Sequence, residues 1–228
     1  MDNQVRDDGK IVTIPRYSGF QRVNHWITAI LFILLALSGL SLAFPSLFFL
    51  SALFGGGAAA RAIHPWLGLA LVVSFFWLAA GLVSRNIIHG DDITWLRNIR
   101  RVLANEHEGL PELGKYNLGQ KGVYWSQALL ILILLGSGLA IWQEYFGGAT
   151  SIPMQRFAAS IHSLAAMIAI AIIFIHVYAA FWTKGTLRAM TRGTVTGGWA
   201  YVHHRKWLKE MLGRDSAAAA PAPRARRE

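Results

Sequence analysis

The sequence contains no cysteine among its 228 residues. This absence excludes disulfides, thiolate-bound zinc, iron–sulfur clusters ligated by this chain and haem attached through a Cys-x-x-Cys-His motif. Charged residues are also scarce, at 15% of the chain, whereas 54% of it is hydrophobic. Soluble domains carry about 25% charged residues. So few charges cannot cover so apolar a chain, which argues against a soluble single-domain enzyme.

Four long segments contain no Asp, Glu, Lys or Arg: residues 26–60, 62–84, 122–143 and 157–183. A helix needs about 20 apolar residues to cross the hydrocarbon core of a bilayer, and backbone groups in lipid must be satisfied within the segment. The first segment is too long for one span and is interrupted by Pro45, which predicts an apolar loop after the first helix. The sequence therefore predicts an all-α integral membrane protein, a bundle of four transmembrane helices at about 25–44, 62–84, 122–143 and 154–183.

Basic residues are distributed unevenly along the chain. Residues 1–25, the loop 85–121 and the segment from 184 onward together hold 20 of the 22 Lys and Arg residues. Loops with an excess of Lys and Arg remain in the cytoplasm, so we predict that both termini and the 85–121 loop are cytoplasmic. Topology thus accounts for the net charge of +10, and we predict no nucleic-acid partner.

The chain outside the spans divides by composition. Residues 1–24 are predicted to form a cytoplasmic N-terminal segment, 25–183 the membrane domain, 184–215 a cytoplasmic interfacial segment and 216–228 a disordered Ala/Pro/Arg-rich tail. In 197–214, we expect three aromatic residues to anchor the chain at the membrane surface: Trp199, Tyr201 and Trp207.

The 85–121 loop contains its own helical pattern. Four apolar residues recur at helical spacing and three arginines take the other side: Ile93, Leu96, Ile99 and Leu103 against Arg97, Arg100 and Arg101. This pattern predicts an interfacial amphipathic helix over 93–103, lying along the headgroups of membrane lipid.

Four of the eight histidines lie in or at the ends of the apolar spans: His25, His64, His162 and His176. Ionisable side chains at membrane depth are rare and usually functional. His162 and His176 are 14 residues apart on one predicted helix. Both rings therefore project from nearly the same face, separated by about 21 Å along the helix axis.

The predicted topology sorts these histidines by depth. The fourth helix begins outside, so His162 is at the outer level and His176 at the inner level. The first helix enters from the cytoplasm, which places His25 at the inner level, and the second enters from outside, which places His64 at the outer level. We therefore predict two pairs, His64 with His162 and His25 with His176.

Two imidazoles on opposite sides of a planar macrocycle, held between facing helices, form the bis-histidine haem arrangement. Without cysteine the haem must be the non-covalent b type, so the pairs predict two haems b suited to one-electron transfer. Zinc is a competing interpretation, but it normally takes four ligands and each level offers two. Structural histidines, bonded to neighbouring carbonyls, are another.

The other histidines and two methionines are weaker candidates. His89 and His107 lie in a polar loop, and His203 and His204 lie among basic residues, so we expect all four at the surface. Two methionines in the fourth span, Met154 and Met167, are interpreted as packing residues.

Four sequence segments carry a resemblance to a known family: RVNHW (22–26), RAIHPWLG (61–68), NEHEGLPELGKYNLGQK (105–121) and IFIHVYAAFWTKG (173–185). In this order, from about residue 17 to residue 207, they resemble the cytochrome b, or gamma, subunit of respiratory membrane-bound formate dehydrogenase. The N-terminal extension and the Ala/Pro/Arg tail lie outside the resemblance.

The resemblance implies a multi-pass subunit of an oxidoreductase complex in the bacterial cytoplasmic (inner) membrane. In that family a catalytic molybdenum or tungsten (alpha) subunit oxidises formate, and an iron–sulfur (beta) subunit relays the electrons. The cytochrome carries them through two haems b to a quinone, menaquinone or ubiquinone. By position, the outer haem takes His64 and His162, and the inner haem takes His25 and His176.

The family's quinone pocket maps onto Asn117, Gly119, Gln120 and His176. From the residues alone, Asn-x-Gly before an apolar span is a turn and helix-entry signal. Its position at the cytoplasmic mouth of the third helix, level with the inner haem, favours a site. Two basic residues at similar depth, Arg22 and Lys121, are candidates to balance haem propionates.

Other classes of protein remain open at this stage. The cytochrome b subunit of a membrane hydrogenase, or of a related molybdoenzyme, has the same histidine logic and differs only in the loop motif. A small transporter would be expected to carry charged residues or broken helices at the midplane. A haem-free membrane anchor would leave the paired depths unexplained.

Overall fold

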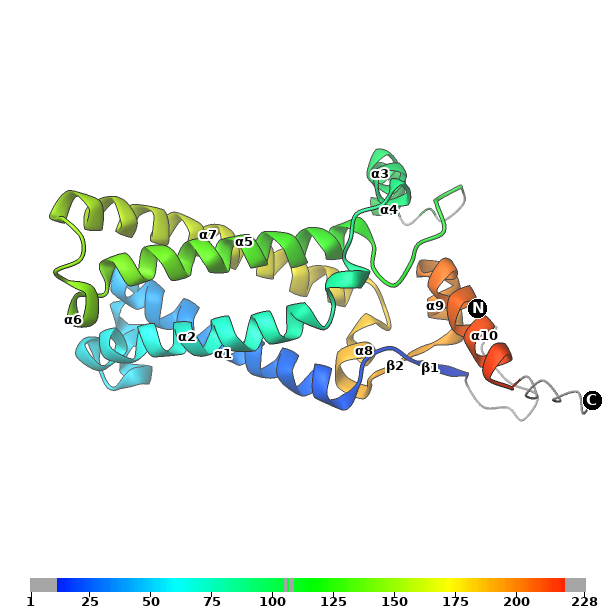
Figure 1. Ribbon diagram of the computed structural model, residues 1–228, viewed down its shortest axis with the longest axis horizontal. Coiled ribbons are helices and arrows are strands. Elements are labelled where there is room, and N and C mark those ends of the chain that lie inside the picture. The colour runs from blue at the N-terminus through cyan, green and yellow to red at the C-terminus, as the bar shows by residue number, and fades with distance from the viewer. Residues whose placement is uncertain (1–11, 105, 107–108, 220–228) are drawn as a thin grey trace, which may run out of the picture.

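The computed structural model describes residues 12–104, 106 and 109–219. Four long helices lie side by side in a bundle (Figure 1): α1 (Gly19–Ala43), α2 (Gly57–Ala80), α5 (Leu118–Ile141) and α7 (Ile152–Trp182). Each is long and apolar enough to cross a membrane, and only 11–17% of each apolar window is buried within the protein. Few side chains of these helices are therefore buried within the protein, and the exposed apolar ones are available to contact lipid. The chain is a multi-pass membrane protein.

Two of the helices begin earlier than the predicted bounds because polar caps start them. Ser18 accepts a hydrogen bond from the Gln21 N–H at 3.2 Å, and Gln21 Oε1 accepts from the Ser18 N–H at 3.0 Å. This capping box starts α1 at Gly19 rather than at about residue 25,. An equivalent box at Asn117 starts α5 at Leu118 rather than at residue 122. Each of these first turns contains a basic residue, so it lies outside the segments without charged residues from which the spans were predicted.

The bundle consists of two helical hairpins. α1 packs mainly against α2, and α5 packs mainly against α7. The predicted apolar loop after α1 is a 3₁₀ helix, η1 (Pro45–Phe54). It lies at the same end of the bundle as α6 (Gln143–Phe146), on the left of Figure 1. We call this the α6 end.

The opposite end carries a small folded unit, here called the α10 cap. It contains the antiparallel strands β1 (Thr13–Pro15) and β2 (Thr194–Thr196), and the helices α8 (Thr186–Arg192), α9 (Gly197–His203) and α10 (Arg205–Ala219). Trp199 and Trp207 are 7% and 4% exposed in its core. The prediction that they anchor the membrane surface is therefore wrong, because pairing of β1 with β2 creates a core that they fill. Tyr201 remains exposed.

Two other predictions about the segments outside the bundle require correction. α10 continues to Ala219, so the predicted disordered tail from 216 is helical over its first residues, and residues 220–228 lie outside the described chain. The predicted single helix over 93–103 is divided into α3 (Gly90–Arg97) and α4 (Ile99–Leu103), after the short turn η2 (Val83–Arg85). The break falls at Asn98, whose side chain donates to Thr94 O at 2.8 Å and ends α3.

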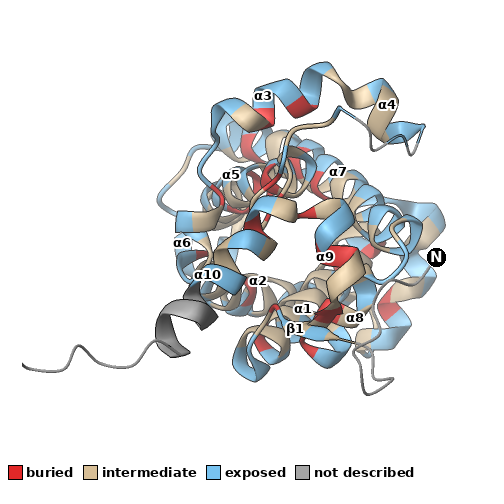
Figure 2. Cartoon of the chain, turned by 90° about the vertical axis from the view of Figure 1, so that its right-hand side faces the viewer, coloured by how far each residue is buried: buried red, intermediate tan, exposed pale blue. Residues whose placement is uncertain are grey.

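α3 and α4 stand beside the bundle (Figure 1), and α3 contacts α5. Asp92 and Trp95 are the buried residues of α3, while Ile93 and Leu96 are exposed. A view from the α10 end shows exposed and partly buried residues over most of the outer surface of the helices (Figure 2).

Candidate functional site

His64 and His162, which were predicted to lie at the outer level and are here called the outer pair, join the two hairpins near the α6 end. The ring centroids of His64 (α2) and His162 (α7) are 6.2 Å apart. His64 Nδ1 lies 2.8 Å from Ser38 Oγ on α1, and His162 Nδ1 lies 3.0 Å from Ser137 Oγ on α5. Each histidine is thus held by a serine on the other helix of its own hairpin.

These serines determine the tautomer of the histidines. The Ser38 hydroxyl donates to Leu34 O at 2.8 Å, and the Ser137 hydroxyl donates to Ile133 O at 2.6 Å. Each hydroxyl therefore accepts from the imidazole, so the proton is on Nδ1 and the lone pair is on Nε2. A hydrogen bond from the ring nitrogen that does not bind the metal fixes the orientation of metal-binding histidines. Both rings consequently offer Nε2 to a metal.

Glycines next to these serines make room for the rings. A Cβ atom on Gly39 would lie 3.2 Å from His64 Cε1, and one on Gly138 would lie 3.3 Å from His162 Cε1. Sequence reasoning missed these serines and glycines. The signal was present as the tripeptide Ser-Gly-Leu, which occurs at 38–40 and again at 137–139. It marks the first helix of each hairpin.

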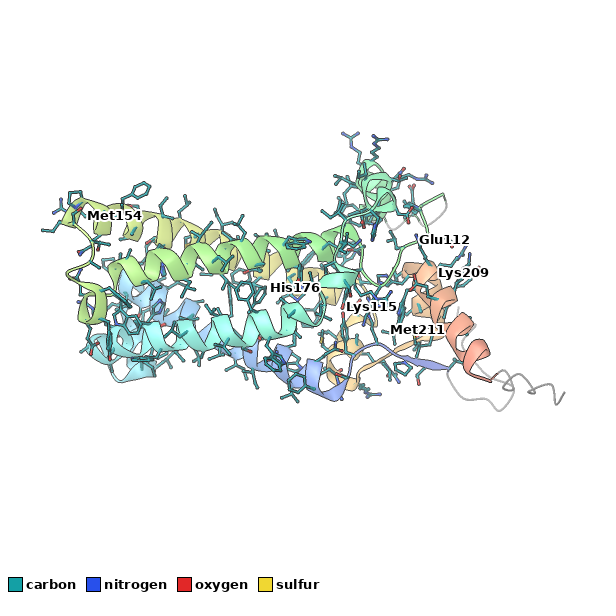
Figure 3. The ribbon with its side chains drawn as sticks, in the orientation of Figure 1. Glu112, Lys115, Met154, His176, Lys209 and Met211 are labelled. Carbon is teal, nitrogen blue, oxygen red and sulfur yellow. The ribbon has the colours of Figure 1, made fainter. Side chains whose placement is uncertain are left out.

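The inner pair lies toward the α10 end. The ring centroids of His25 (α1) and His176 (α7) are 6.4 Å apart, and Figure 3 shows His176 inside the bundle. His25 Nδ1 is buried and has no hydrogen-bond partner among the described residues. The structure therefore brings together both histidine pairs expected from the sequence, one near each end of the bundle.

The donor set fits haem better than zinc. A metal–imidazole bond is about 2 Å long, so two rings bound to opposite sides of one metal have centroids about 6 Å apart. Both pairs have this spacing. Zinc would need further ligands. The described part of the chain has no group of three or more His, Cys, Asp or Glu side chains placed to hold one metal ion.

A cavity of about 700 Å³ adjoins the outer pair. Its walls come from all four long helices and are mainly apolar, with His64, His162, Gly39 and Gly138 among the lining residues. Binding sites for cofactors typically have this size and lining. Met167 also lines this cavity, whereas Met154 is exposed at the start of α7, so neither packs in a protein core.

Three of the four expected quinone-pocket residues lie together at the start of α5. Asn117 Oδ1 accepts from the Gln120 N–H at 2.9 Å, and Gln120 Oε1 accepts from the Asn117 N–H at 3.1 Å. Trp95 of α3 packs nearby, since a Cβ on Gly119 would lie 3.6 Å from its ring. Within the described residues, none of the three hydrogen-bonds His176, which lies on α7. The amide oxygens cap α5, and the amide N–H groups remain as donors.

Lys121 is not available to balance a propionate. Its Nζ lies 2.6 Å from Asp92 Oδ2 and donates to Ile87 O at 2.8 Å. The two charged side chains are 6% and 3% exposed. Lys121 therefore ties α3 to the first turn of α5, which is a role that the sequence did not indicate.

The α10 cap holds the segment that leads into Asn117. Three consecutive carbonyls accept hydrogen bonds: Leu113 O from the Trp207 N–H at 3.3 Å, Gly114 O from His204 Nδ1 at 2.7 Å, and Lys115 O from the Arg16 guanidinium.

The prediction that His204 is a surface residue is wrong, because it is 1% exposed. Burial, followed by the nearby Arg16 charge, lowers the pKa of His204 well below its usual value, so the ring is neutral. Its neighbours in sequence had suggested a solvated surface. Contacts with residues almost the whole chain away decide its burial.

Comparison with known proteins gives consistent matches. The family described as prokaryotic cytochrome b561 matches residues 16–193. The cytochrome b556(fdo) subunit of formate dehydrogenase from Escherichia coli (strain K12) is 45% identical over 199 residues, covering 87% of this chain and 93% of the relative. The cytochrome b556(Fdn) subunit of the nitrate-inducible enzyme from that strain is 40% identical, with 87% and 91% coverage. A formate dehydrogenase cytochrome b556 subunit from Haemophilus influenzae is 35% identical, with 92% and 87% coverage.

Proposed function

The chain belongs to the prokaryotic cytochrome b561 family, and from this premise we propose that it is the cytochrome b subunit of a membrane-bound formate dehydrogenase. The resemblance drawn from the sequence is confirmed by relatives of 35–45% identity that carry this name. Family membership implies haem b. The observation that carries the proposal is the presence of two histidine pairs at metal-bridging distance, on helices long enough to span a membrane.

We place one haem b at each pair, bound by His64 and His162 at the outer level and by His25 and His176 at the inner level. Haem bound by two histidines supplies one-electron transfer. The chain's own residues orient the outer ligands, since Ser38 and Ser137 hold the rings of His64 and His162 through Nδ1. This leaves Nε2 of each ring to bind the iron. The walls of the cavity at that pair are mainly apolar.

The α10 end is proposed to face the cytoplasm, because 20 of the 22 basic residues lie on that side of the spans,. Both termini are then cytoplasmic, and the inner pair lies on the cytoplasmic side of the membrane domain. Reporter fusions after Gly57 and after Glu108 should therefore report opposite sides of the membrane. The same side for both would contradict this topology.

A quinone, menaquinone or ubiquinone, is proposed to bind near Asn117, Gly119, Gln120 and His176. The capping box supports this location, since it leaves the amide N–H groups of Asn117 and Gln120 to donate to a quinone carbonyl. Protons for quinone reduction would come from the cytoplasm. The partners are the iron–sulfur subunit, from which electrons arrive at the outer level, and the catalytic molybdenum or tungsten subunit, in the bacterial inner membrane.

An optical spectrum of the purified chain, oxidised and then reduced with dithionite, tests the proposal. We expect a b-type spectrum with haem in twofold excess over protein. Replacing His64 or His162 by Ala should remove one haem, and replacing His25 or His176 should remove the other. Absence of haem absorbance from the wild-type chain would refute the function, and loss of the same haem from His64→Ala and His176→Ala would refute the pairing.

The link to formate is tested in the assembled complex. Deleting this subunit should abolish formate-dependent quinone reduction while formate oxidation with a soluble dye continues, because formate is oxidised in a partner. Quinone reduction that survives the deletion would assign the role to another protein.

A further inference from the structure

Several buried hydrogen-bond donors at the α10 end have no acceptor among the described residues, and among them are Arg16 Nη1, Arg22 Nε, Thr186 Oγ1 and Trp199 Nε1. We call these four side chains the donor cluster. Arg16 and Trp199 are only 5% and 7% exposed. Buried polar groups in folded proteins are nearly always hydrogen-bonded. A cluster of unsatisfied donors therefore indicates a group that supplies acceptors.

The donor cluster is contiguous. The Arg16 guanidinium lies 4.9 Å from the Trp199 ring centroid. A Cβ atom on Gly185, which precedes the threonine, would lie 3.1 Å from Trp199 Cδ1. Gly193 lies between the backbone of Arg16 and the side chain of Arg22, since its carbonyl accepts from the Arg16 backbone N–H at 2.8 Å and a Cβ on it would lie 3.0 Å from Arg22 Nε.

The donor cluster is also cationic without a counter-charge. The Arg16 guanidinium contacts Lys115 O and the neutral ring of His204, and Arg22 Nη1 donates to Thr191 O. Within the described residues, neither arginine forms a salt bridge. A buried charge without a partner is strongly unfavourable. Neither arginine has an opposite charge beside it in the described part of the chain, so an anion is the group that best satisfies these donors, and a carboxylate matches the guanidinium geometry,.

Through Arg22, the donor cluster reaches the turn of α1 that carries His25 of the inner histidine pair. Arg22 is three residues before His25 on α1, and residues three apart share a helix face. The hydrogen bond from Arg22 Nη1 to Thr191 O, at 2.7 Å, packs α8 with its Thr186 against this turn of α1. At the outer pair, by contrast, no described residue has a buried polar atom without a partner.

We infer that the donor cluster is a carboxylate-binding site that takes the propionate groups of the haem held by His25 and His176. The inference rests on the proposed function, since it requires a haem at the inner pair. Arg22 and Lys121 were the propionate partners expected from the sequence. Asp92 already pairs with Lys121, so the propionate partners proposed beside Arg22 are Arg16, Trp199 and Thr186.

The test measures coupling between the arginine and the propionates. A His64→Ala background retains only the inner haem, and the chain is loaded with haem b or with its dimethyl ester, which lacks the carboxylates. Release to excess apomyoglobin is then timed. Arg22→Gln should speed release of haem b about tenfold, because a charge-assisted hydrogen bond is lost. It should change release of the ester by less than about twofold, because both changes remove the same interaction.

Three further variants complete the experiment. Arg192→Gln is the matched control, because it removes an exposed arginine from α8, the helix that carries Thr186. We expect it to change the rate of haem release by less than about twofold. Trp199→Phe and Thr186→Val each remove one donor while preserving shape and charge, and should speed release of haem b but not of the ester.

Several results would overturn the site. If Arg22→Gln speeds the release of haem b and of its dimethyl ester equally, the arginine has a structural role and does not bind the propionates. Equally slow release of the ester and of haem b from the wild-type cluster would mean that water satisfies the donors. Release that depends on added acetate or phosphate would assign the cluster to a soluble anion. A wild-type chain that binds no haem at all would refute the proposed function itself, whereas the other results leave it intact.

Discussion

Removing the Asp92 carboxylate should destabilise the protein strongly, because its partner Lys121 would remain buried as an unpaired cation. The two charges are 2.6 Å apart and their side chains are 3% and 6% exposed. In Asp92→Ala, the Lys121 ammonium keeps Ile87 O as its one hydrogen-bond partner among the described residues. Breaking a buried ion pair from one side costs about 3–5 kcal/mol, and we expect the free energy of unfolding to fall by that amount.

The neighbouring Asp91 provides a matched control. Its Oδ2 lies 2.7 Å from Lys206 Nζ, but these side chains are 46% and 53% exposed. Exposed pairs are screened by solvent and contribute about 0–1 kcal/mol. Asp91→Ala should therefore have little effect, although it removes the same group one position along the chain.

The double variant Asp92→Ala, Lys121→Met separates the two possible origins of the loss. The penalty comes mainly from the stranded charge, so removing Lys121 as well should restore most of the stability. If the double variant is as unstable as Asp92→Ala, the loss comes instead from the packing of α3 on α5 or from the His89 N–H that Asp92 Oδ2 caps at 2.8 Å.

The free energy of unfolding is measured by titrating SDS into dodecylmaltoside micelles and following helicity by circular dichroism. Equal destabilisation by Asp92→Ala and Asp91→Ala would refute the reasoning, because it would show that burial does not distinguish the two pairs.

Three other changes test the sites. Asn117→Asp with Gln120→Glu preserves the oxygens that cap α5 but removes the amide donors. The KM for quinone should therefore rise about tenfold while the haem content is unchanged. An unchanged KM in steady-state quinone reduction would place the quinone elsewhere. Ser137→Ala leaves His162 Nδ1 without its acceptor and should weaken retention of the outer haem about 10-fold or more, with the inner haem as control in the same spectrum. Burial, with Arg16 nearby, lowers the pKa of Lys115 to about 8. The folded state therefore binds fewer protons than the unfolded state between pH 8 and about 10, so the SDS midpoint should rise across this window in the wild type and stay level in Lys115→Met.

The membrane helices could be predicted because their signal is local. Long runs without charge are compatible with lipid only as helices, whatever the rest of the chain does. The ends were less predictable, since Ser18 and Asn117 start α1 and α5 before Arg22 and Lys121. A capping box outweighs a single basic residue near the membrane surface.

The two histidine pairs also followed from local rules. The spacing of His162 and His176 on one helix, together with the alternating direction of successive spans, was enough to match each with a partner. The structure brings the rings of both pairs to about 6 Å.

The surroundings of the histidines and of the quinone segment were decided only by the tertiary structure. Ser38 and His64 are 26 residues apart, Asp92 and Lys121 are 29 apart, and Arg16 and His204 are 188 apart. Composition marked Trp207 and His204 as surface residues, yet the α10 cap buries both. Hydrophobic periodicity and charge act along the chain and determine which segments cross the membrane. Which polar group meets which depends on packing between distant segments, where a buried group must find a partner wherever the fold provides one.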